Sequence, residues 1–301
     1  MKNPASAALA VDCRCTLGEG ILWWAARRAL VWTDIEQSTL WMYGVGDRQT
    51  RKWALPDRLG SLAICESGRL LLGLAKGLFL ADPDAATGAE LPVESVIAIE
   101  PHLLRNRIND GRTDRAGNFV FGTFNEARDG PGGSFYQYSS RHGLRRLDVG
   151  GVVIPNSICF SLDGRTMYFC DSPDTRIRQC EYDAETAGVA NVREFVRLRK
   201  HEGFPDGSVI DAEGCLWNAA WGAGLVRRYA PDGRVLDEIV VAAKNPTCVA
   251  FGGDALGDLY ITSARQEMSD DELASTPEAG GVYLATPGLR GVSDAPFRDE
   301  S

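Results

Sequence analysis

Four residues with oxygen-bearing side chains open similar segments of this 301-residue chain: Glu19, Asn109, Asn156 and Asp206. A small or turn-forming residue follows each one, as in Gly-Glu-Gly, Asn-Asp-Gly, Asn-Ser and Asp-Gly. Taken singly, each is typical of a solvated turn. Taken together, two carboxylates and two amide oxygens are the hard donors that Ca²⁺, Mg²⁺ or Mn²⁺ prefer. The chain has 3 histidines and none stands at such an opening, which disfavours a histidine-rich site.

The segments that these residues open recur along the whole sequence. Each has an apolar strand, a turn such as Asp-Gly, Ala-Gly or Ser-Gly, a second strand, and a third strand rich in aromatic and basic residues. The openings are 42, 48, 47, 50 and 41 residues apart, close to the length of a propeller blade. We therefore predict an all-β fold, a six-bladed β-propeller with a central metal site, as one domain over residues 1–301. Its blade repeats open near residues 19, 61, 109, 156, 206 and 247.

Equivalent positions of successive blades converge at the channel of a propeller, so the four openings are expected to face one another. Arg107 lies two residues before Asn109, on the same side of a strand, and is predicted to reach the same place. Glu126 ends the second strand of the third repeat and could reach the channel mouth. Neighbouring residues are predicted to be structural: Thr123 as packed, Asp34, Asp171 and Ser263 as strand-end caps, and at least one of Trp23 and Trp24 as blade core.

Part of the N-terminal region is predicted to join the last blade, whereas the two extreme ends of the chain are predicted to be frayed. A strand over residues 9–12 is predicted to complete the last blade beside residues 282–284, because an unpaired sheet edge is a liability. Residues 1–8 and 289–301 are expected to be frayed, since the tail carries Pro296, Asp299 and Glu300.

The composition restricts the class of function. Hydrophobic residues make up 44% and charged residues 24%, as in a globular protein with a sizeable core. A net charge of −9 disfavours nucleic acid as a partner. No apolar run approaches the roughly 20 residues of a membrane span, and no signal peptide is recognisable, so we expect a cytoplasmic protein without a membrane partner. The 8 cysteines include no CxxC pair and are predicted to be small buried hydrophobes.

Several motifs in this order resemble those of the SMP-30/gluconolactonase/LRE family, the regucalcin-like sugar lactonases. The resemblance extends from about residue 9 to residue 290. The motifs are Cys-Arg-Cys-Thr-Leu-Gly-Glu-Gly at 13–20, Arg-Ile-Asn-Asp-Gly at 107–111, Pro-Asn-Ser at 155–157, Pro-Asp-Gly at 205–207, Ile-Asp-Ala-Glu-Gly-Cys-Leu-Trp at 210–217 and Pro-Glu-Ala-Gly-Gly-Val-Tyr at 277–283. The resemblance implies a six-bladed propeller lactonase with one divalent metal ion.

The resemblance also implies roles for individual residues. Glu19, Asn156 and Asp206 correspond to the metal ligands of the family, and Asp206 corresponds to its general base as well. Arg107 and Asn109 correspond to the residues that hold the substrate.

Three positions depart from the family pattern. Ile21 stands where a proline is expected after Gly-Glu-Gly, and Ser157 replaces the usual glycine after the ligand asparagine. A further glutamate of the family contacts the substrate; it aligns to Ala127, one residue past Glu126, and we take Glu126 as the corresponding candidate.

The hypothesis is therefore hydrolysis of an aldono-1,4- or 1,5-lactone, such as glucono-, galactono-, xylono- or arabinonolactone. The cofactor would be one divalent ion, Ca²⁺, Zn²⁺, Mn²⁺, Mg²⁺ or Fe²⁺, in a monomer or weak homodimer. Two alternatives stay open. One is a non-catalytic, calcium-binding regulatory propeller, and the other is a lactonase or esterase for a less polar substrate, with Trp23 or Trp24 on the rim.

Overall fold

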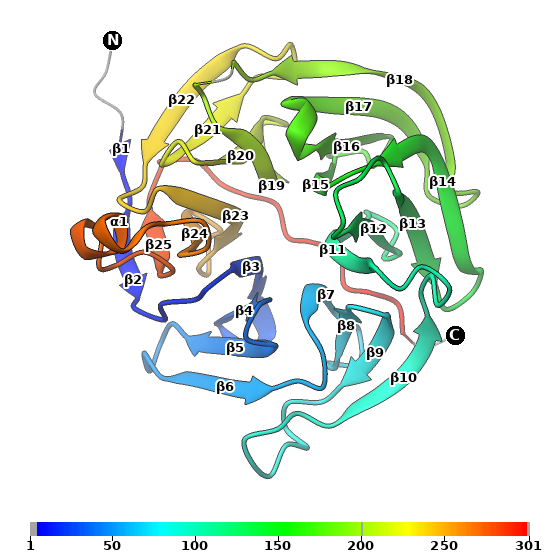
Figure 1. Cartoon of the computed structure of the whole chain (residues 1–301), viewed down its shortest axis with the longest axis horizontal. Helices are drawn as coiled ribbons and strands as arrows, with labels where there is room; N and C mark the ends of the chain where they lie inside the picture. Colours follow the sequence, from blue (N-terminus) through cyan, green and yellow to red (C-terminus); the bar gives the residue numbers. More distant parts are fainter. Residues whose placement is uncertain (1–4, 200, 300–301) are drawn as a thin grey trace.

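The computed structural model of the chain describes residues 5–199 and 201–299 and confirms the six-bladed propeller. Six sheets surround a central channel, and the first strand of each repeat lies nearest the axis (Figure 1). Within each blade, neighbouring strands are antiparallel and follow one another in sequence, except where strands from the N-terminal segment join the last two blades.

The first three blades have four strands each. Blade one contains β3 (Gly18–Trp24), β4 (Ala29–Asp34), β5 (Thr39–Gly44) and β6 (Thr50–Ala54), with a 3-10 turn η1 (Ala25–Arg27). Blade two contains β7 (Leu59–Ile64), β8 (Leu70–Leu74), β9 (Gly77–Ala81) and β10 (Val93–Ala98). Blade three contains β11 (Asn106–Thr113), β12 (Phe119–Asn125), β13 (Gly133–Ser139) and β14 (Gly143–Val152).

The other three blades follow the same plan. Blade four contains β15 (Pro155–Phe160), β16 (Thr166–Asp171), β17 (Arg176–Asp183) and β18 (Gly188–Arg197), with a 3-10 turn η2 (Ser172–Asp174). Blade five contains β19 (Phe204–Ile210), β20 (Leu216–Trp221), β21 (Leu225–Tyr229) and β22 (Val235–Val240). Blade six contains β23 (Asn245–Gly252), β24 (Asp258–Ala264), β25 (Val282–Ala285) and β2 (Ala8–Val11).

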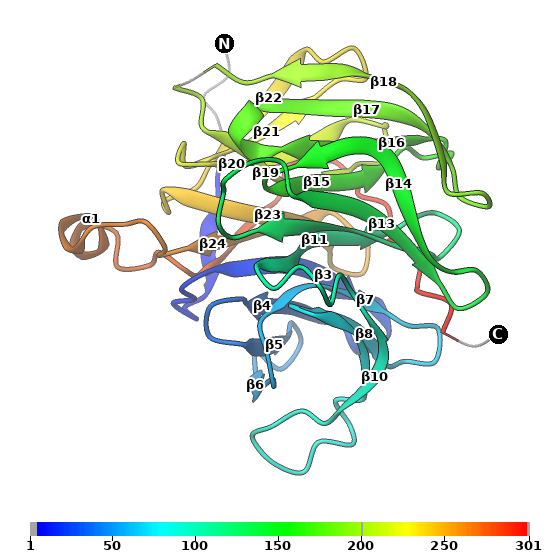
Figure 2. The same ribbon diagram turned by 45° about the vertical axis from the view of Figure 1, so that its right-hand side comes forward.

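The repeat is produced by short hairpins between the first and second strands. Gly117 and Gly214 occupy these turns with φ of 82° and 77°, a left-handed conformation that costs glycine little. The only α-helix of the described residues is α1 (Asp270–Ser275), which projects from the side of the molecule in Figure 2. No helix in the described part of the chain has the length and apolar character needed to cross a bilayer.

The N-terminal segment closes the ring as predicted. β2 pairs with β25 through Leu9 and Tyr283, so the first and last parts of the chain share one sheet. The expected fraying of residues 5–8 is wrong, because β1 (Ala5–Ser6) adds a fifth, parallel strand to blade five beside β22. Residues 1–4 lie outside the described part of the chain.

The expected fraying of residues 289–299 is also wrong. This segment crosses one end of the channel (Figure 1) and is held by backbone bridges at Gly291 and Phe297. Phe297 is buried, and Asp294 forms a 2.7 Å ion pair with the buried Arg112 of β11. The segment is therefore ordered, despite its polar composition, because Phe297 is buried and Asp294 pairs with Arg112. Residues 300–301 lie outside the described part.

The hydrophobic core lies between neighbouring blades. One cluster joins blades one and two, another joins three and four, and a third joins five and six. At the last of these contacts, Trp217 and Phe251 meet edge to face with ring centroids 6.0 Å apart. All 8 cysteines are free and 7 are buried, which confirms that they serve as small core residues. The inner strands are therefore fixed relative to one another by packing from behind.

Candidate functional site

Each inner strand is irregular where its repeat opens. The strand register shifts at Glu19/Leu22, Leu59/Ser61, Ile108/Gly111, Asn156/Cys159, Pro205/Ser208 and Pro246/Val249. A β-bulge inserts a residue and redirects the neighbouring side chains. The six bulges therefore account for the shared position of the polar openings that the sequence displays.

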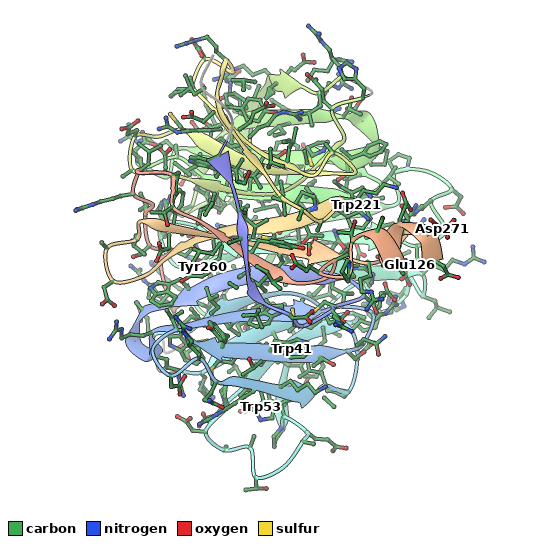
Figure 3. The ribbon with its side chains drawn as sticks, turned by 90° about the vertical axis from the view of Figure 1, so that its left-hand side faces the viewer. Trp41, Trp53, Glu126, Trp221, Tyr260 and Asp271 are labelled. Carbon is green, nitrogen blue, oxygen red and sulfur yellow. The ribbon has the colours of Figure 1, made fainter. Side chains whose placement is uncertain are left out.

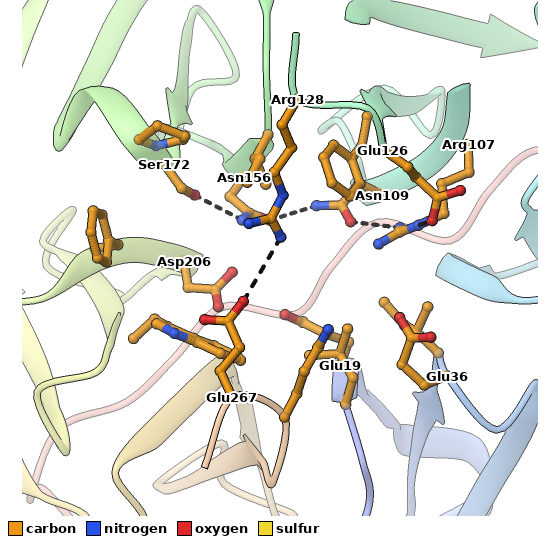
Figure 4. Close-up of a pocket in the computed structure, with 18 of the residues that line it drawn as sticks. Glu19, Glu36, Arg107, Asn109, Glu126, Arg128, Asn156, Ser172, Asp206 and Glu267 are labelled. Carbon is orange, nitrogen blue, oxygen red and sulfur yellow. Dashed lines mark hydrogen bonds and ion pairs between the residues drawn. The ribbon is translucent and has the colours of Figure 1, made fainter. Parts of the chain in front are cut away.

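All six predicted site residues line one cavity of about 480 Å³ at the end of the channel (Figure 4). They come from four blades: Glu19 from β3, Arg107 and Asn109 from β11, Glu126 from the turn after β12, Asn156 from β15 and Asp206 from β19. The volume is within the range of small-molecule sites. The structure thus brings together every residue that the sequence singled out, while their chemical roles stay predictions.

The two carboxyl groups, Glu19 and Asp206, are poorly solvated and close to each other. Removal from water raises the pKa of Glu19 to about 8, and the negative charge of Asp110 contributes. Burial also raises the pKa of Asp206 well above its usual range, and repulsion from Glu19 is the next cause. Carboxylates that share a site in this way favour either a proton or a bound cation between them.

Hydrogen bonds fix the orientation of Asn156. Its Nδ2 donates to Ser172 Oγ over 2.9 Å, and its Oδ1 accepts from Asn109 Nδ2 over 3.1 Å. The amide oxygen rather than the nitrogen therefore faces the cavity beside Asn109. Asn109 is satisfied at both ends, because its Oδ1 accepts from Arg107 Nη1 over 2.7 Å and its Nδ2 also donates to Pro155 O. Asn109 links Arg107 to Asn156, which suits a positioning or substrate contact better than a metal ligand.

Arg107 and Glu126 form the polar wall of the cavity. Arg107 Nε donates to Glu126 Oε1 over 3.3 Å, and Arg58 Nη2 donates to the other oxygen over 2.9 Å. The hydrogen bond from Arg58 is the main reason why the pKa of Glu126 is lowered. Arg107 also lies over the Phe124 ring at 4.8 Å. Among the described residues Arg107 Nη2 has no hydrogen-bond partner, so this nitrogen is available to a bound molecule.

Sequence reasoning missed the residues that end or follow the second strand of most blades. These positions complete the cavity wall and supply Ile35, Glu36, Ser172, Pro173, Trp221, Gln266 and Glu267. Arg128 and Glu267 form a 3.9 Å ion pair across the mouth, from the turns after β12 and β24 (Figure 4). The signal was present in the sequence, because the second-strand ends share one phase of the repeat just as the openings do.

The Trp23-Trp24 pair is not on the rim of this cavity. Both residues line a separate cavity, near the C-terminal segment, and Trp23 stacks on Tyr260 at 6.5 Å. Figure 3 shows Tyr260 at the opposite end of the propeller from Glu126 and Trp221. The alternative that placed a tryptophan of this pair on the rim is therefore wrong, since Glu19 and Trp24 lie near opposite ends of β3.

The residues that we expected to be structural behave as such. Asp34 accepts hydrogen bonds from the backbone of Thr16 and Leu17, and Asp171 accepts from two backbone N–H groups of the turn before β15. Ser263 bonds Gly281 O, and Thr123 is buried.

The described residues contain no group of three or more histidine, cysteine, aspartate or glutamate side chains that could hold a metal ion. The donor set at the cavity mixes two carboxylates with the amide oxygen of Asn156. The central metal site of the predicted fold therefore stays a prediction.

The fold and the cavity define a class: a six-bladed propeller with buried oxygen donors and an arginine at one end of its channel. Residues 17–265 match the family described as SMP-30/Gluconolactonase/LRE-like region, and the chain belongs to that family. The resemblance seen in the sequence motifs is thus confirmed.

Three relatives are similar over nearly the full length of the chain. The chain is 43% identical to L-arabinolactonase of Azospirillum brasilense, over 98% of this chain and 97% of that protein. It is 34% identical to 6-deoxy-6-sulfogluconolactonase of Pseudomonas putida, over 93% and 94% of the two chains. The crystal structure of a calcium-binding protein, regucalcin, from Agrobacterium tumefaciens superposes with a TM-score of 0.90 at 31% identity, covering 98% of each chain.

Proposed function

We propose that this protein hydrolyses the ring ester of a sugar lactone, an aldono-1,4- or 1,5-lactone, to the aldonic acid. The observation that carries the proposal is the convergence of Glu19, Asp206 and Arg107 on one cavity of small-molecule size, in a chain 43% identical to an L-arabinolactonase. The protein is accordingly a hydrolase of carboxylic esters. Gluconolactones, galactonolactones and the pentonolactones are the substrates to be compared.

Glu19, Asn156 and Asp206 would hold one divalent cation. The fit is supported by the two raised carboxyl pKa values, because a cation would relieve both the poor solvation and the mutual repulsion. It is also supported by the amide of Asn156, whose oxygen is turned into the cavity by Ser172. A bound cation would supply Lewis acidity, which polarises an ester carbonyl and makes water more acidic. Oxygen donors alone favour Ca²⁺, Mg²⁺ or Mn²⁺ over Zn²⁺.

The chain's own residues supply the other requirements of ester hydrolysis. The Asp206 carboxylate would accept the proton of the attacking water, a role that its place in the cavity allows. Arg107 Nη2 would donate to the lactone oxygen or to a ring hydroxyl, where a positioned donor contributes roughly 3–4 kcal/mol. Glu126, held ionised by Arg58, would accept hydrogen bonds from sugar hydroxyls.

The deciding experiment is a pH-indicator assay with a panel of pentono- and hexonolactones. We expect turnover of at least one lactone, loss of turnover after chelation, and recovery on addition of one of the candidate cations. The same panel without turnover, combined with tight Ca²⁺ binding, would favour the calcium-binding alternative, which the similarity to regucalcin supports. Turnover that survives exhaustive chelation would contradict the metal but not the lactonase.

A further inference from the structure

Two serine hydroxyls of blade four hold consecutive carbonyls of blade five. Ser157 Oγ donates to Asp206 O over 2.6 Å, and Ser172 Oγ donates to Pro205 O over 2.8 Å. Both serines are buried, and both carbonyls lie at the bulge of β19 that turns Asp206 toward the cavity. Blade four therefore fixes the backbone of the bulge both before and after the Cα atom of Asp206.

Ser157 makes this contact at the cost of an unfavourable backbone conformation. Its φ is 61°, in the left-handed region where a residue with a Cβ is disfavoured and glycine is not. Its hydroxyl accepts from Ser208 Oγ and Asn218 Nδ2, so its own proton is committed to Asp206 O. Asn218 Nδ2 also donates to Asp206 O over 2.9 Å. Ser157 thus has a strained backbone and a hydroxyl that bonds the main chain of Asp206. Retained strain of this kind indicates that the position of Asp206 matters for function.

Ser172 performs a second task with the same hydroxyl. Because its proton goes to Pro205 O, its oxygen accepts from Asn156 Nδ2, and this fixes which end of the Asn156 amide faces the cavity (Figure 4). One hydroxyl thus connects the side chain of Asn156 to the backbone next to Asp206. Asn156 and Asp206 belong to different blades, four and five.

We propose that Ser157 and Ser172 are positioning residues that set the distance and orientation of Asn156 relative to Asp206, and so prepare the cation site. Ser157 follows Asn156 directly in the chain and bonds the backbone of Asp206, while Ser172 joins the Asn156 amide to the preceding carbonyl. Neither serine needs to touch the cation. This inference rests on the proposed function, because it concerns the same donors.

The test measures Mn²⁺ affinity by titration calorimetry in the full chain, without substrate, for the variants Ser157→Ala, Ser172→Ala and the double variant. Partners that orient metal ligands typically change affinity or activity by about 10- to 100-fold, so we expect a loss of that size in each single variant. Lactone turnover is measured in parallel, and kcat is expected to fall more than KM rises.

Three further variants separate positioning from general stability. Ser61→Ala removes an equally buried hydroxyl at the corresponding bulge of blade two, which does not bond the Asp206 carbonyl or either serine, and Mn²⁺ affinity is expected to stay unchanged. Ser172→Thr keeps the hydroxyl and is expected to restore binding. Ser157→Gly relieves the backbone strain but lacks the hydroxyl, so it is expected to bind Mn²⁺ as weakly as Ser157→Ala.

The outcomes distinguish this inference from the proposed function. Wild-type Mn²⁺ affinity in both alanine variants, with only their melting temperatures lowered, would overturn the positioning role and leave the lactonase untouched. An equal loss in Ser61→Ala would also overturn it, because the loss would then follow from removing any buried hydroxyl at a bulge. Wild-type protein that binds none of the candidate cations would overturn the positioning role and the proposed cation, and the lactone assay alone would then test the hydrolase.

Discussion

Asp206 is placed where a carboxylate is costly without a partner. It is buried, it faces Glu19, and serines of blade four bond its own carbonyl and the carbonyl of Pro205. A protein rarely retains two poorly solvated carboxyl groups side by side unless their chemistry is used. Replacing the Asp206 carboxylate by a neutral side chain should therefore lower activity and raise the stability of the metal-free protein.

We predict that Asp206→Asn abolishes lactone turnover while the metal-free protein becomes more stable. The amide keeps the shape of the side chain but cannot accept the proton, and loss of a general base typically costs about 10²- to 10⁴-fold in rate. Repulsion from Glu19 and the burial of a charge both disappear, so the melting temperature in chelator should rise. Asp163→Asn, on an exposed hairpin, is the control. An active Asp206→Asn enzyme would remove this residue from the mechanism.

A second prediction concerns Arg107, which is compared with its neighbour Arg58. Both arginines bond Glu126, but only Arg107 lines the cavity. Arg107→Ala should lower kcat/KM by roughly 100-fold or more, the effect of losing one positioned donor, and should leave Mn²⁺ affinity nearly unchanged. Arg58→Ala should have a much smaller effect in steady-state kinetics. Equal losses in the two variants would indicate that both act only by holding Glu126.

At the residue scale, much of the candidate site could be predicted from the sequence. Glu19, Asn109, Asn156 and Asp206 share one phase of the repeat, and repeated phase becomes proximity in a closed ring. The missed residues, such as Ser172 and Trp221, end or follow the second strands, whose polar end residues we expected to be strand-end caps and not cavity wall. Hydrogen-bond partners across blades, such as Ser157 with the Asp206 carbonyl, depend on register at a bulge, and no sequence spacing specifies that.

The decisive element of the fold is the bulged inner strand. The bulge in β11 lets Arg107 and Asn109 reach the cavity, while Asp110 accepts from Ile158 N in the next blade over 2.9 Å. Similar bonds join blades four and five, through Ser157 and Asp206 O, and blades six and one, through Thr247 and Gly18 O. The strands could be predicted from alternation and turn glycines, but the bulges could not, because their sequence reads as the start of a regular strand.

The C-terminal segment, residues 289–299, was expected from the sequence to be frayed but is held against the propeller. It supports a third prediction. Phe297 is buried against Tyr138, with ring centroids 5.9 Å apart. Phe297→Ala should lower the free energy of unfolding by about 3–5 kcal/mol, as is usual for a buried phenylalanine, in urea titration. Arg298→Ala, an exposed neighbour, serves as the control and should cost little. A loss below about 1 kcal/mol in Phe297→Ala would return the tail to the frayed state that we first expected.

At the scale of the whole molecule, the ring is held together by packing between blades and by one sheet that joins the two ends of the chain. This closure could be predicted, because an open edge beside β25 demanded a partner. The ring also brings together the proposed donors Glu19, Asn156 and Asp206, which come from blades one, four and five. A bound cation would therefore connect three blades that are distant in sequence.

The last prediction follows from that connection. A ligand that binds only the folded state at 100 times its Kd stabilises it by about 2.7 kcal/mol, which corresponds to roughly 5 °C for a chain of this size. We expect Mn²⁺ or Ca²⁺ to raise the melting temperature of chelated protein by this order, and to do so in one cooperative transition. Asp206→Asn should lose most of the shift, because a neutral amide replaces one of the two anionic donors, whereas Asp163→Asn should keep it. A cation-induced shift of equal size in Asp206→Asn would place the binding elsewhere.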